Sequence, residues 1–135
     1  MDLTPELIEK MRVFQDEIES RNRIAARYNA ALADVALVPR VTNGATSVWA
    51  QYTLRVPAPR REALAAGLKS SGIPTAVYYA KPLHQQTAYR KYPVAGNGLP
   101  VSERIATEVI SLPMHPYLEK DEQDFIINAV KAELC

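Results

Sequence analysis

The sequence predicts an α+β fold, in which a small, mainly antiparallel sheet is packed with helices and entered by one long N-terminal helix. Both ends of the chain carry apolar residues at the spacing of an α-helix, and the middle carries short β-type runs that end at prolines. A chain of 135 residues is long enough for one domain with a hydrophobic core. We therefore expect a single small domain behind the long helix.

Apolar residues recur every three or four positions across residues 5–33, which predicts an amphipathic helix. Thr4 is suited to cap it, and Pro5 suits its first position. At 1.5 Å per residue, this helix is roughly 40 Å long, which exceeds the diameter expected of a compact domain of this size.

The first half of this helix needs a partner for its apolar side chains Met11, Phe14 and Ile18. A kink could fold it back on its own domain. Alternatively, it packs on protein outside this chain, which we favour because the stripe lies too far along the helix to be covered. We divide the chain into an interdomain helix, residues 1–34, and a small α+β domain, residues 35–135.

Three segments in the middle of the chain are predicted to form strands. Residues 35–38 are a short apolar run that ends at a proline, and residues 47–56 alternate, with Val48 on the same face as Tyr52 and Leu54. A helix over residues 59–70 follows and is ended by Gly72, which can adopt the left-handed conformation. Residues 75–79 then form the third strand, so the order is β, α, β.

The last third of the chain predicts two helices around a short apolar segment. Residues 100–110 and 121–134 have helical spacing, and Asp121 is the expected cap of the second helix. Residues 111–117 are interrupted twice by proline, so they form at most an edge strand.

Composition excludes several classes of protein. The chain has 16 Lys and Arg against 15 Asp and Glu, so its charge gives no reason to expect a nucleic acid partner. No apolar run is long enough to span a membrane, and the N-terminus does not resemble a signal peptide. Cys135 is the single cysteine, which fits a reducing, cytoplasmic setting. His84 and His115 have no carboxylate or thiol at a metal-ligand spacing, so we expect no metal site.

Polar-tipped side chains gather where the third predicted strand ends. Tyr78, Tyr79, Lys81 and His84 lie within seven residues, beside Pro82. Ligand sites often form in loops that follow strands, so these four are the candidate binding residues. The alternative is structural: in a persistent strand, one tyrosine faces the core and the other faces solvent, and His84 forms a hydrogen bond in a capping turn.

Four segments carry a resemblance to a known family: SVWAQYTLRV at 47–56, GIPTAVYY at 72–79, KPLHQQ at 81–86 and SLPMHPYL at 111–118. In this order and spacing they resemble the C-terminal part of the DegT/DnrJ/EryC1/StrS aminotransferases, which use pyridoxal phosphate (PLP) and act on nucleotide sugars. The enzymes that aminate C3 of a UDP-linked 3-keto uronic acid for O-antigen synthesis are the most similar. The resemblance covers nearly the whole chain.

The resemblance implies a C-terminal fragment of a homodimeric transaminase that takes a UDP-sugar and an amino-acid donor, with glutamate as the expected donor. In this family the Schiff-base lysine and the phosphate-binding cup belong to the large N-terminal domain. The lysines of this chain lack that context: Lys10, Lys69, Lys81, Lys91, Lys120 and Lys131. We expect no catalytic residue, no bound PLP and no activity in this chain alone.

The family places His-Tyr where this chain has Tyr78 and Tyr79, and those side chains reach toward the nucleotide sugar. Tyr79 matches, whereas Tyr78 departs from the pattern, so we expect Tyr78 to position substrate and not to move protons. The rival reading is a stand-alone binding or interaction module without catalysis.

Overall fold

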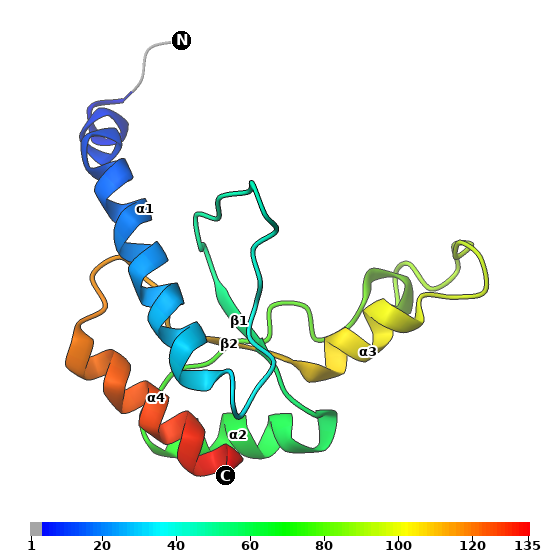
Figure 1. Ribbon diagram of the computed structural model, residues 1–135. Helices are drawn as coiled ribbons and strands as arrows, with labels where there is room; N and C mark the ends of the chain where they lie inside the picture. Colours follow the sequence, from blue (N-terminus) through cyan, green and yellow to red (C-terminus); the bar gives the residue numbers. More distant parts are fainter. Residues whose placement is uncertain (1–3) are drawn as a thin grey trace.

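The computed structural model describes residues 4–135 and has the α+β architecture that the sequence predicts (Figure 1). In chain order, its elements are α1 (Pro5–Leu32), β1 (Tyr52–Arg55), α2 (Ala58–Ser70), the 3-10 helix η1 (Leu83–Gln85), α3 (Pro100–Glu108), β2 (Val109–Leu112) and α4 (Lys120–Leu134). Within residues 4–135, none of the helices has both the length and the hydrophobicity needed to cross a membrane.

The sheet consists of β1 and β2, which pair antiparallel with Tyr52 opposite Leu112 and Thr53 opposite Ser111. Isolated bridges extend it on both sides, from Leu37 to β1 and from Ala76 to β2. The strand β2 therefore lies between two neighbours, and the prediction that residues 111–117 form at most an edge strand is wrong. Residues 35–38 and 75–79, predicted as strands, supply one bridge residue each.

Pairing at the third predicted strand stops because prolines flank it. Pro74 has no N–H to donate, and Ala76 exchanges two backbone hydrogen bonds with Ser111, at 3.1 and 2.8 Å. The chain then turns at Tyr78 and Tyr79, ahead of Pro82. The segment is a bridge followed by a turn.

The strand predicted over residues 47–56 is formed only from Tyr52, because the backbone of Trp49 has a positive φ of 48°. This conformation breaks the alternation of side chains, which is why Val48 is 51% exposed while Trp49 is 9% exposed. Three contacts stabilise Trp49: its carbonyl accepts from Arg21, its indole N–H donates to Asn22 at 3.0 Å, and its backbone N–H donates to the Ser47 hydroxyl.

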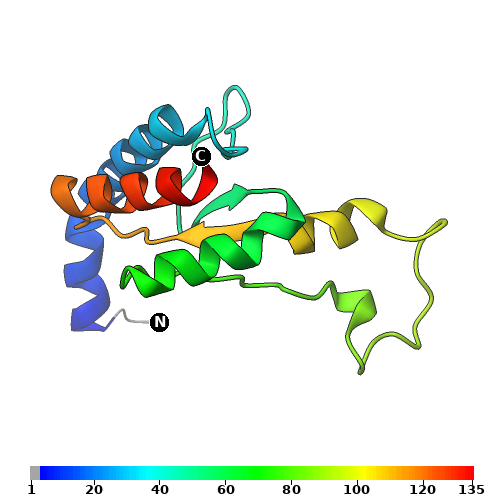
Figure 2. The same cartoon turned by 90° about the horizontal axis from the view of Figure 1, so that it is seen from below.

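The core lies on one face of the sheet, where α1, α2 and α4 pack together. The helices α2 and α4 run beside each other in both views (Figures 1 and 2). At the centre, the rings of Tyr28 and Tyr52 stack with centroids 4.7 Å apart. Their hydroxyls donate to the Pro113 carbonyl at 3.1 Å and to Asn29 Oδ1 at 2.7 Å. Burial raises the pKa of both phenols, because the phenolate would lose its hydration.

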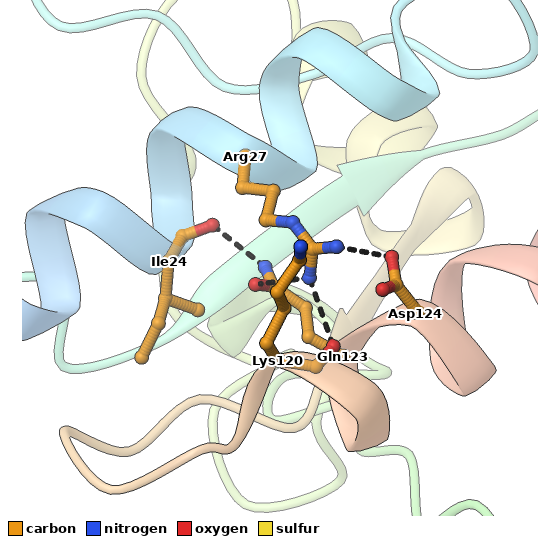
Figure 3. Close-up of polar contacts among 5 residues, drawn as sticks. All are labelled: Ile24, Arg27, Lys120, Gln123 and Asp124. Carbon is orange, nitrogen blue, oxygen red and sulfur yellow. Dashed lines mark hydrogen bonds and ion pairs between the residues drawn. The ribbon is translucent and has the colours of Figure 1, made fainter.

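The second half of α1 is attached to α4 by a polar cluster around Gln123, a side chain that is only 2% exposed (Figure 3). Gln123 donates to the Ile24 carbonyl at 2.8 Å and accepts from Arg27 at 3.2 Å. Arg27 also donates to the Lys120 carbonyl at 3.0 Å and pairs with Asp124. These contacts fix the direction in which α1 leaves the small domain.

The first half of α1 extends beyond the rest of the fold (Figure 1). Thr4 caps it as predicted, accepting from the Leu7 N–H, and Pro5 begins the helix. Met11 and Phe14 are 60% and 55% exposed, whereas Tyr28 and Leu32 are fully buried. Packing of this half on protein outside the chain, and the boundary after residue 34, stay predictions.

Two predicted helix boundaries differ from the structure. The helix α3 ends at Glu108, two residues early, because Val109 and Ile110 pair with β1 instead. The helix α4 begins at Lys120 after Glu119, so the prediction that Asp121 is its cap is wrong, and Asp121 lies in the first turn. The end of α2 is as predicted, with Gly72 at a φ of 76°.

Candidate functional site

An apolar groove of about 760 Å³ opens on the sheet face that the core helices do not cover. Residues 52 and 54 of β1 point into the core, so Gln51 and Thr53 point the other way and form part of the groove floor. Ser111 of β2 lies beside Thr53, and their hydroxyl oxygens are 2.8 Å apart. The floor thus carries hydroxyl groups within an otherwise apolar surface.

The groove has two walls that come from different parts of the chain. Residues 76–79 and 82–84 form one wall, which the bridge between Ala76 and Ser111 anchors to the sheet. The helix α3 forms the other wall through Ser102, Ile105 and Ala106. Between them, residues 86–99 run out from the body of the domain and back to α3 (Figures 1 and 2).

Tyr78 and Tyr79 both line the groove and are 57% and 79% exposed. They lie in a turn, so the structural alternative in which one of them faces the core does not hold. Two phenol groups with free access to the groove can donate or accept hydrogen bonds from a polar ligand.

The other two candidate residues behave differently. Lys81 is exposed and is not among the groove-lining residues, so the structure does not bring it together with the tyrosines. His84 lines the groove and has a 15% exposed side chain, whose Nε2 lies 2.9 Å from Glu103 Oε1 on α3. His84 therefore makes a hydrogen bond, as the structural alternative for this residue predicts, and it also lines the candidate site.

Sequence reasoning missed several groove residues, notably Tyr89, Tyr92 and Ser102. The rings of Tyr89 and Tyr92 are 6.4 Å apart, and the Lys91 ammonium lies 5.7 Å from the Tyr92 ring centroid. The signal in the sequence is the pair of tyrosines that flank two basic residues, Arg90 and Lys91.

The side chains around the groove do not fit covalent attachment of PLP. They offer phenols, hydroxyls and one imidazole, while no lysine of residues 4–135 lines the groove, so an amine for a Schiff base is lacking there. Nor does the described part of the chain contain a group of three or more His, Cys, Asp or Glu residues that could hold a metal ion.

Solved structures of aminotransferases have the same fold as this chain. An aminotransferase from Brucella abortus matches with a TM-score of 0.90 and 49% identity over 95% of this chain and 34% of its own. DesV from S. venezuelae, solved with a ketimine intermediate, matches with a TM-score of 0.85 and 31% identity over 93% of this chain and 34% of its own.

The chain belongs to the DegT/DnrJ/EryC1/StrS aminotransferase family, whose sequence model matches residues 7–131. The UDP-2-acetamido-2-deoxy-3-oxo-D-glucuronate aminotransferase of Pseudomonas aeruginosa is 42% identical over 114 residues, which are 84% of this chain and 30% of that enzyme. The chain thus spans about a third of the length of its relatives.

Proposed function

We propose that this chain forms one side of the substrate pocket in a PLP-dependent aminotransferase that transfers an amino group, from glutamate, to the C3 keto group of a UDP-sugar. The observation that carries this proposal is the groove lined by Tyr78, Tyr79 and His84 in a chain with a 3-oxo-glucuronate aminotransferase as a 42% identical relative. The product serves lipopolysaccharide and O-antigen synthesis in the cytoplasm.

The residues of this chain bind and orient the sugar. Tyr79, the more exposed of the two tyrosines, offers a hydroxyl to a ring hydroxyl or carboxylate of the sugar, and Tyr78 does the same from the neighbouring position. The apolar side chains of Leu83 and Ile105, one on each wall, contact the C–H faces of the ring and exclude water from the keto carbon. Lys81 does not line the groove, so any contact that it makes with the sugar comes from outside the groove.

The Schiff-base lysine and the groups that hold PLP come from protein outside residues 1–135. Residues 1–34 then serve as the interdomain helix, with the exposed stripe at Met11 and Phe14 packed on the larger domain. The complete enzyme is a homodimer, as expected from the family resemblance.

The test is a transamination assay on the complete enzyme that contains this sequence, with a UDP-linked 3-keto uronic acid and glutamate. The expected products are 2-oxoglutarate and a UDP-3-amino sugar of the corresponding mass. A complete enzyme that binds PLP but forms no amino sugar from any UDP-3-keto sugar contradicts the proposal.

A further inference from the structure

The contact between His84 and Glu103 joins the two walls of the groove. Its Nε2 to Oε1 distance is 2.9 Å, and the two residues are 19 positions apart, on η1 and α3. In residues 4–135 no other side-chain hydrogen bond connects η1 with α3. The position of the imidazole at the groove wall therefore depends on this carboxylate.

The carboxylate also determines which ring nitrogen remains for a ligand. An ionised carboxylate only accepts hydrogen bonds, so the proton of this contact must be on Nε2 of His84. In the neutral imidazole, Nδ1 is then an acceptor, and within the described part of the chain it has no hydrogen-bond partner. An acceptor on the groove wall suits a donor such as a sugar hydroxyl.

We propose that Glu103 is a positioning residue that holds the His84 imidazole at the groove wall with Nδ1 free to accept a hydrogen bond from a hydroxyl of the bound sugar. This inference rests on the proposed function and extends it to the recognition of the ligand. Glu103 acts only through His84: it is 43% exposed and is not itself among the groove-lining residues.

The first experiment follows the ring nitrogens of His84 in this chain by long-range ¹H–¹⁵N correlation spectra over a pH series. We expect the neutral ring to be protonated at Nε2 alone in the wild-type chain. Glu103→Gln, whose amide oxygen still accepts, retains this pattern, whereas Glu103→Ala shows averaged nitrogen shifts. Unchanged His84 shifts in Glu103→Ala overturn the positioning role.

The second experiment measures the Kd of UDP-N-acetylglucosamine by calorimetry on the complete enzyme. We expect Glu103→Ala and His84→Ala each to weaken binding about 2- to 10-fold, the effect of one lost hydrogen bond. The double variant should bind no more weakly than His84→Ala, because Glu103 acts through the histidine. Glu122→Ala is the matched control, since Glu122 also lies in the first turn of a helix but far along the chain on α4.

The two possible failures can be distinguished. If the wild-type enzyme does not bind the UDP-sugar, the proposed substrate class is wrong. Equal binding by the wild-type enzyme and Glu103→Ala, or a further loss in the double variant, contradicts the role of Glu103 alone.

Discussion

Replacement of Gln123 by Met tests whether the polar cluster between α1 and α4 holds the long helix in place. Methionine has nearly the same length and shape, but it cannot donate to the Ile24 carbonyl or accept strongly from Arg27. A neutral hydrogen bond contributes about 0.5–1.5 kcal/mol, and one to a charged group about 1.5–3 kcal/mol. Arg27 keeps Asp124 and the Lys120 carbonyl, so we expect a loss of roughly 2 kcal/mol.

Urea unfolding followed by circular dichroism measures this loss, and for a chain of 135 residues it corresponds to a fall in Tm of roughly 6–8 °C. The matched control is Asn128→Met, an exposed position on the same helix, which should change the free energy of unfolding by less than about 0.5 kcal/mol. Equal stability of Gln123→Met and the wild-type chain would refute the role of the cluster.

Three further predictions concern other parts of the fold. The pKa values of Tyr28 and Tyr52 are raised, so the folded chain keeps protons that the unfolded chain releases above pH 10. These two phenols therefore add no pH dependence to stability below that pH and should lower it above, by up to about 1.4 kcal/mol per pH unit for each phenol, in unfolding titrations at pH 9–12; the absence of this fall in the wild-type chain relative to Tyr28→Phe would contradict it. Trp49→Ala should cost roughly 3–5 kcal/mol in urea unfolding, because it removes a buried indole and its bond to Asn22, and a loss below about 1 kcal/mol would exclude this role. Met11→Ser with Phe14→Ser should reduce concentration-dependent self-association in sedimentation velocity, whereas identical association in both proteins would show that the apolar half of α1 is not responsible.

The helices could be predicted from the sequence because their signals are local. The cap Thr4, the first-turn Pro5 and the left-handed Gly72 act through the few residues around them, and the structure has all three as predicted. The error in the predicted cap of α4 also has a local cause. Acidic residues favour the first turn of a helix as well as the cap position, and Asp121 and Glu122 both lie in the first turn.

The strands are harder to predict from the sequence, because each strand depends on a partner far along the chain. Residues 47–51 alternate as a strand should, but Trp49 adopts a positive φ to bond with Arg21 and Asn22 of α1, contacts that no local pattern records. Likewise, Val109 is predicted to be helical but lies in β2, because it pairs with Arg55 across the sheet.

The candidate site was predictable in part. Tyr78, Tyr79 and His84 are close in sequence, and the structure brings them to one groove. The partner of His84 was not predictable, because Glu103 reaches it only through the path of residues 86–99. Lys81 belongs to the same run of polar-tipped residues, but its position in the sequence does not determine on which side of the turn it lies.

The most direct test of a sugar-binding role for the groove replaces Tyr79 with Phe and with Ala in the complete enzyme. We expect Tyr79→Phe to raise KM for the UDP-keto sugar about 2- to 10-fold by loss of one hydrogen bond, and Tyr79→Ala to raise it further. Tyr117→Phe is the control, since Tyr117 is 66% exposed but lies outside the groove. Wild-type kinetics in both Tyr79 variants would contradict the proposal that this groove binds the sugar.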